Sequence, residues 1–176
     1  MKIISGVVDA TATAYFLSYK CLMNKHLEEC EYNSDYFSAY FVPAITTAAF
    51  SCELALKSIC QSLNGKAPKG HDLYKLFKTL DESTRKDIMN RTINAYNLKS
   101  EILKVDDRID ENDFNNLLTY HKDSFTIWRY FYEGSPSIDL DFIEALMFCL
   151  NKIEDDYSSY IINQLSIRAK KIIKTI

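Results

Sequence analysis

The segment GHDLYKLF places a histidine beside an aspartate, a pair that could perform acid–base chemistry. Histidine titrates near neutral pH and can act as a general base or a metal ligand. An aspartate ahead of an apolar run also caps helices. Since no further ligands stand nearby at metal-site spacing, we predict no metal. We expect His71 to bond loop backbone groups or Glu53, and direct chemistry by His71 is the alternative.

A second candidate group is the pair Glu53 and Lys57, four residues apart in ELALKS. A helix places such residues on one face, where an exposed ion pair contributes little to stability. If the pair points inward instead, both charges need further partners. Together with His71 and Asp72, the two residues form a predicted structural polar cluster.

The densest aromatic segment is FTIWRYFYEG. Consecutive aromatic side chains cannot all face one core, so some must be exposed, contact a partner or stack on a ligand. Arg129 could then hold a phosphate while the rings stack on bases. Alternatively, Arg129 and Glu133 form an ion pair at a helix end. The predicted binding residues are Trp128, Arg129, Tyr130, Tyr132 and Glu133.

Helices must position these residues, because apolar residues recur at intervals of three and four. The chain also has only four glycines and three prolines. Helices are predicted over residues 7–29, 34–63, 72–80, 81–99, 110–133 and 139–174, the last bent or split. Pro43 must kink or divide the second helix, and Gly65 ends it. We predict an all-α fold: an antiparallel up-and-down bundle of about five to six helices, in one domain over residues 1–176.

Composition narrows the class of protein. The net charge of −3 argues against a general nucleic-acid coat, although residues 65–80 carry four lysines against one aspartate. The basic group at the C-terminus (Arg168, Lys170, Lys171 and Lys174) is interpreted as cations at a helix end. The five cysteines contain no C-x2-C pair, which indicates reduced, mostly buried thiols. Without a signal-like or membrane-spanning apolar run, we expect a cytoplasmic protein with no membrane contact and no cofactor.

Taken together, AITTAAFSCELALKSICQSLNGKAPKGHDLYKLFKTL and FTIWRYFYEG resemble the HEPN superfamily of small bacterial helical proteins. The resemblance covers roughly residues 43–133. It rests on an E-x3-K helix, a loop containing glycine, and GHDL ahead of an apolar helix. It implies a HEPN-like up-and-down bundle of four or five helices, a two-fold homodimer, and a toxin–antitoxin or phage-defence setting.

Many HEPN proteins are metal-independent endoribonucleases with an R-x4-6-H motif near the end of the penultimate helix, paired across the dimer. Arg129 stands where the resemblance places the motif arginine. Gly134, Ser135 and Pro136 occupy the positions of the histidine, which is absent. We therefore expect a non-catalytic or weakly catalytic module that binds RNA, a nucleotide or a protein partner such as a nucleotidyltransferase.

Two alternatives stay open. In the first, the protein is a divergent metal-independent endoribonuclease in which Arg129, Glu133, His71 and Tyr130 converge and His71 supplies the missing base. In the second, it is an interaction protein without any ligand. Distance distinguishes catalysis from binding, because catalysis needs His71 or Glu133 within hydrogen-bond reach of a substrate position that Arg129 also contacts.

Overall fold

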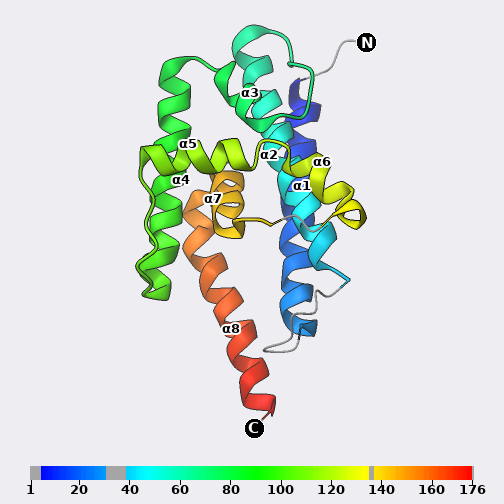
Figure 1. Ribbon diagram of the computed structural model, residues 1–176, viewed down its shortest axis with the longest axis vertical. Helices are drawn as coiled ribbons and strands as arrows, with labels where there is room; N and C mark the ends of the chain where they lie inside the picture. Colours follow the sequence, from blue (N-terminus) through cyan, green and yellow to red (C-terminus); the bar gives the residue numbers. More distant parts are fainter. Residues whose placement is uncertain (1–4, 31–38, 135–136, 176) are drawn as a thin grey trace.

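The computed structural model describes residues 5–30, 39–134 and 137–175, and over these residues the fold is all-α (Figure 1). Two short 3-10 helices, η1 and η2, interrupt the order of the α-helices. The elements are α1 (Ser5–Glu29), α2 (Phe41–Asn64), α3 (Leu73–Lys78), α4 (Glu82–Leu103), α5 (Glu111–Tyr120), α6 (Ser124–Arg129), η1 (Phe131–Glu133), α7 (Leu140–Leu150), η2 (Glu154–Asp156) and α8 (Tyr157–Thr175). The prediction of an all-α fold is confirmed. No described helix is long and apolar enough to cross a membrane.

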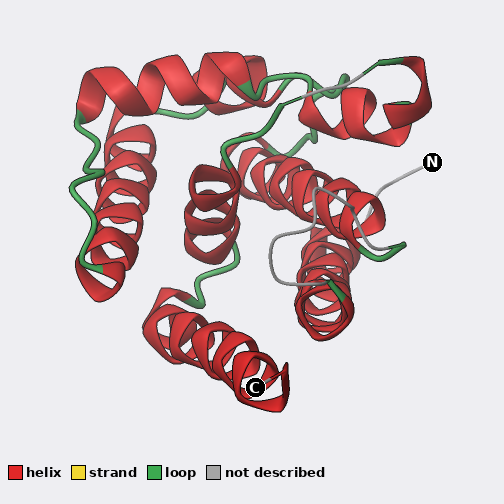
Figure 2. Ribbon diagram, turned by 60° about the horizontal axis from the view of Figure 1, so that its bottom comes forward, coloured by secondary structure: helices red, strands yellow, loops and turns green. Residues whose placement is uncertain are grey.

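The centre of the fold is α7, which lies between the antiparallel pair α1–α2 and α4 (Figures 1 and 2). Its segment LDFIEALMFCL is buried at every position from Phe142 to Leu150. A helix that is apolar on all sides has to be enclosed by neighbours, which explains its central place. The long helix α8 leaves the end of α7 and packs against α1 and α4.

The second helix begins later than the predicted Ser34, whose position lies outside the described residues. It starts at Phe41, so that Pro43 falls in its first turn, where the missing N–H group costs no hydrogen bond. The expected kink or break at Pro43 was therefore wrong. At the other end Gly65 adopts φ +70° and donates its N–H to the Gln61 carbonyl at 2.8 Å, which confirms the predicted stop.

The helix predicted over residues 110–133 was wrong, because the chain there forms three elements, α5, α6 and η1. The first break falls at His121, which is 2% exposed. Its Nδ1 lies 3.2 Å from the Ser124 hydroxyl, and its Nε2 accepts the Asp139 N–H at 3.1 Å. These tertiary contacts turn the backbone where periodicity alone would continue the helix. The helix predicted over residues 139–174 was expected to be bent or split, and it is split into α7 and α8.

Aspartate side chains cap the helices α4 and α5. The Asp81 carboxylate accepts the Thr84 N–H at 2.9 Å, at the start of α4. Asp110 and Asp113 form a capping box at the start of α5, in which each side chain accepts the other residue's backbone N–H. Hydrogen bonding lowers the pKa of both capping carboxylates, Asp81 and Asp110.

Candidate functional site

The predicted polar cluster forms around Glu53, whose side chain is 1% exposed. Lys57 Nζ lies 2.7 Å from its carboxylate, and His71 Nδ1 lies 3.0 Å from both carboxylate oxygens. Glu53 and Lys57 therefore point inward and do not form an exposed ion pair. His71 supplies the additional partner that a buried carboxylate requires. Asp72 takes no part in the cluster. It caps α3 by accepting the Lys75 N–H at 2.8 Å.

His71 bonds Glu53, as one of the two expectations held, yet its side chain is 55% exposed. Its Nδ1 is held by the carboxylate, while in the described part of the chain its Nε2 has no hydrogen-bond partner. A carboxylate that orients one ring nitrogen and leaves the other accessible is the arrangement of a general base. His71 is thus both a structural partner and a group that a substrate can reach.

Phe125 connects the GHDL loop with Arg129. Its ring stacks on Phe50, with centroids 4.4 Å apart, and lies 5.5 Å from the His71 ring. The Arg129 guanidinium lies 5.2 Å from the centre of the Phe125 ring and 4.6 Å from that of Tyr130. Arg129 also donates a hydrogen bond of 2.9 Å to the Tyr130 hydroxyl. His71 and Arg129 therefore both lie against the Phe125 ring, and no hydrogen bond joins these two described residues directly.

We call Phe125, Arg129, Tyr130 and Tyr132 the aromatic–arginine surface. The exposed fractions are 38% for Tyr130 and 79% for Tyr132. Within the described residues, no carboxylate forms an ion pair with Arg129, so its charge faces solvent. A guanidinium that contacts two aromatic rings and forms no ion pair keeps its planar fork of N–H groups available, which suits bidentate phosphate binding.

Two of the predicted binding residues behave differently. Trp128 is 2% exposed and packs between Phe41 and Phe131, with ring centroids 6.0 Å and 5.3 Å away. It is a core residue and cannot stack on a ligand. Glu133 is exposed, yet it does not pair with Arg129, because α6 ends at Arg129 and the four-residue helical spacing is lost.

A buried polar network missed by the sequence prediction surrounds Glu144, which is 0% exposed. Its carboxylate accepts hydrogen bonds from Tyr19, Lys99, Tyr160 and Gln164. Burial by itself lowers the pKa of Lys99, but Glu144 and Asp141 outweigh it and raise that pKa above the ordinary value. The network thus joins α1, α4, α7 and α8 through one carboxylate. The signal available in the sequence was Glu144 itself, a single glutamate within the apolar segment that forms α7.

His121 is a second residue that the prediction left without a role. It stacks on Phe142 with ring centroids 5.9 Å apart, and burial lowers its pKa to about 4. His121 begins the turn between α5 and α6. The next residue in this turn, Lys122, bonds the start of α3, because its carbonyl accepts the Leu73 N–H at 2.8 Å. A neutral His121 therefore holds the segment that positions Phe125 and Arg129.

The thiols show no sign of nucleophilic activation. Cys52, Cys60 and Cys149 are buried, whereas Cys21 is exposed. Burial raises the pKa of Cys52 and raises that of Cys149 to about 12, so both stay protonated at neutral pH.

Comparisons of the chain with models of protein families, with curated proteins and with solved structures found no match.

Proposed function

We propose that this protein is a HEPN-like helical module that binds single-stranded RNA through the aromatic–arginine surface. The observation that carries the proposal is the position of the exposed Arg129. Its guanidinium lies 5.2 Å from the centre of the Phe125 ring and 4.6 Å from that of Tyr130, and it pairs with no described carboxylate. Arg91, by contrast, is neutralised by Glu154.

RNA chemistry matches this surface in two ways. Exposed Tyr130 and Tyr132 offer ring faces to unstacked bases, and each stacked base contributes about 1–3 kcal/mol in proteins that bind single strands. The Arg129 guanidinium meets the phosphate between them. The chain's net charge of −3 disfavours binding to long duplexes, so recognition has to be local.

The test is the affinity of a labelled RNA of about 12 nucleotides, measured by fluorescence anisotropy. Arg129→Ala should weaken binding at least about tenfold, equal to about 1.4 kcal/mol. Its melting temperature should stay unchanged, because the side chain is exposed. The matched control is Arg108→Ala, which removes an equally exposed arginine from the loop before α5. Equal affinity for the two variants would contradict the proposal.

A second candidate function is metal-independent RNA cleavage. One observation in its favour is that Glu53 bonds both Lys57 and the Nδ1 atom of His71. Another is that His71 and Arg129 both contact the Phe125 ring. In this case His71 Nε2 would accept the proton of the attacking hydroxyl, and Arg129 would stabilise the charge on the phosphate.

Cleavage is tested by incubating the same RNA in EDTA. A cleaving enzyme should lose activity in both His71→Ala and Arg129→Ala, while Arg108→Ala stays active. Intact RNA after incubation with every variant and the parent protein would leave binding as the function.

A further inference from the structure

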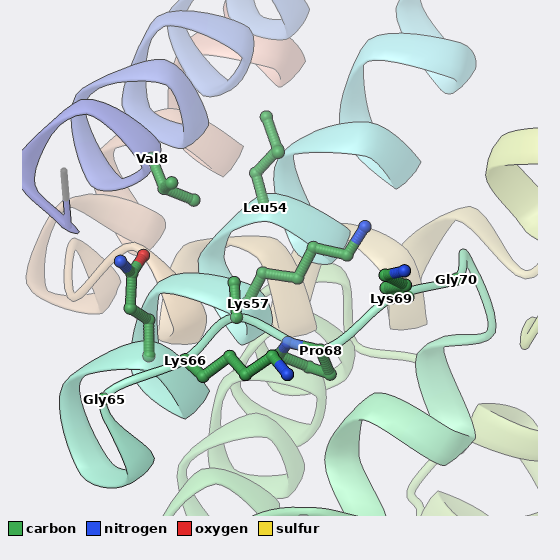
Figure 3. Close-up of a pocket in the computed structure, with 10 residues that line it drawn as sticks. Val8, Leu54, Lys57, Gly65, Lys66, Pro68, Lys69 and Gly70 are labelled. Atoms are coloured by element: carbon green, nitrogen blue, oxygen red, sulfur yellow. The ribbon is translucent and has the colours of Figure 1, made fainter. Parts of the chain in front are cut away.

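A pocket of about 650 Å³ lies beside the polar cluster, between α1, α2 and the loop that follows α2 (Figure 3). Its lining includes Val8 from α1, Leu54 and Lys57 from α2, and Lys66, Pro68 and Lys69 from the loop. The volume is within the range of pockets that bind small molecules. Figure 3 shows Val8 and Leu54 on one side and the loop on the other, with the Lys57 side chain between them.

The pocket carries positive charge. Three lysines line it, and none of the residues that line it is acidic. Lys57 is neutralised by Glu53 at 2.7 Å. Lys66 and Lys69 are exposed, and neither forms an ion pair with any described carboxylate. Two uncompensated ammonium groups on one short loop favour an anion with more than one oxygen acceptor.

The backbone of the same loop supplies further donors. Across the described residues, no acceptor takes the N–H groups of Lys66, Ala67, Lys69 or Gly70. Gly70 has a φ of +96°, a conformation that glycine adopts without strain, and nothing lies within 4 Å of the position of a Cβ atom there. The loop is therefore open to a ligand and has N–H groups available to an anion.

Val8 and Leu54 form an apolar wall opposite the loop, and Pro68 adds one apolar side chain on the loop itself. A ligand complementary to both sides has an apolar, planar or compact body and an anionic end. We propose that this pocket binds a small organic phosphate of the size of a nucleoside monophosphate. The phosphate lies at Lys66 and Lys69, and the base lies against Val8, Leu54 and Pro68. This site is separate from the aromatic–arginine surface and goes beyond RNA binding.

Occupancy should be sensed at the polar cluster. Lys57 lines the pocket and bonds Glu53, which in turn bonds His71. A phosphate held at Lys66 and Lys69 brings negative charge into the pocket that Lys57 also lines, so it changes the electrostatic surroundings of Glu53 and of the His71 ring. The imidazole resonances of His71 should move on binding, whereas those of buried His121, which contacts Ser124 and Asp139, should stay in place.

The experiment titrates adenosine 5′-monophosphate (AMP) into the full chain and follows it by NMR and calorimetry, without RNA. We expect saturable binding with a dissociation constant of about 1 mM or below. Adenosine and inorganic phosphate should each bind at least about tenfold more weakly, because each meets one side of the pocket only. The pocket variant Lys66→Ala/Lys69→Ala should weaken AMP binding at least about tenfold.

The matched control is Lys75→Ala/Lys86→Ala, which removes the same charge from exposed lysines outside the pocket. Equal affinity of both double variants for AMP, or no saturable binding to the parent protein, would overturn the pocket proposal. Because RNA is absent, this result is independent of the Arg129 test: AMP binding without RNA binding refutes only the proposed function, and the reverse refutes only the pocket.

Discussion

The stability of this protein should fall as the pH drops from 7 to 5, and His121 is the residue responsible. Its pKa is about 4 in the folded protein, against an ordinary value of 6.5. Above pH 6.5 the histidine is neutral in both states, so its contribution to stability is complete. Between pH 6.5 and about 4 the unfolded chain takes up a proton that the folded protein resists.

The size of the effect follows from the two pKa values. Linkage gives a loss of about 2 kcal/mol at pH 5 and about 3 kcal/mol at pH 4, both relative to pH 7. The structural reason is the pair of contacts at the ring. Nε2 must be unprotonated to accept the Asp139 N–H, and the ring stacks on Phe142 away from water. A loss of about 2 kcal/mol is a large fraction of the stability of an ordinary domain.

Urea unfolding at pH 7 and at pH 5, followed by circular dichroism, measures this loss in the parent protein and in His121→Gln, which cannot titrate. The variant should lose about 2 kcal/mol less between the two pH values, whatever its absolute stability. The comparison also removes contributions from other groups, among them Asp139, whose pKa is raised by burial. Parallel pH profiles, or an NMR titration of His121 with a midpoint near 6.5, would refute the reasoning.

Three further predictions concern the buried carboxylates Glu144 and Glu53 and their partners, with unfolding free energies as the measurement. Glu144→Ala should cost about 3–5 kcal/mol because it leaves the buried ammonium of Lys99 with Asp141 alone, and a cost below about 1 kcal/mol would contradict the network. His71→Ala should cost about 1 kcal/mol or less, because Lys57 still satisfies Glu53. Glu53→Ala should cost more than His71→Ala, and the opposite order would show that His71 is the main anchor of the cluster.

The site was predictable where it depends on local spacing. Glu53 and Lys57 lie four residues apart on a helix, so their pairing follows from helix geometry once the helix exists. The contact of His71 with Glu53 was one of two expectations from the sequence, the other being a bond to loop backbone groups. The pairing of Arg129 with Glu133 was not formed, because the helix that would have aligned them ends between the two residues.

The sequence by itself determined the helical character of the chain and most helix ends. Caps such as Asp81 and Asp110 and the stop at Gly65 act through hydrogen bonds and dihedral preferences within a few residues. Only the tertiary structure decided which way the side chains of FTIWRYFYEG face. Trp128 is buried because rings from distant segments surround it, whereas Arg129, one residue later, faces solvent.

The break at His121 and the network around Glu144 have the same origin. His121 ends α5 because its ring bonds Asp139, which lies 18 residues further along the chain. Glu144 is stabilised by Tyr19 and Lys99, which come from helices far away in sequence. Such contacts form only after the helices pack, and no periodicity within one segment encodes them. The helices are therefore a local property of this sequence, whereas the surface that we propose binds RNA is a product of their packing.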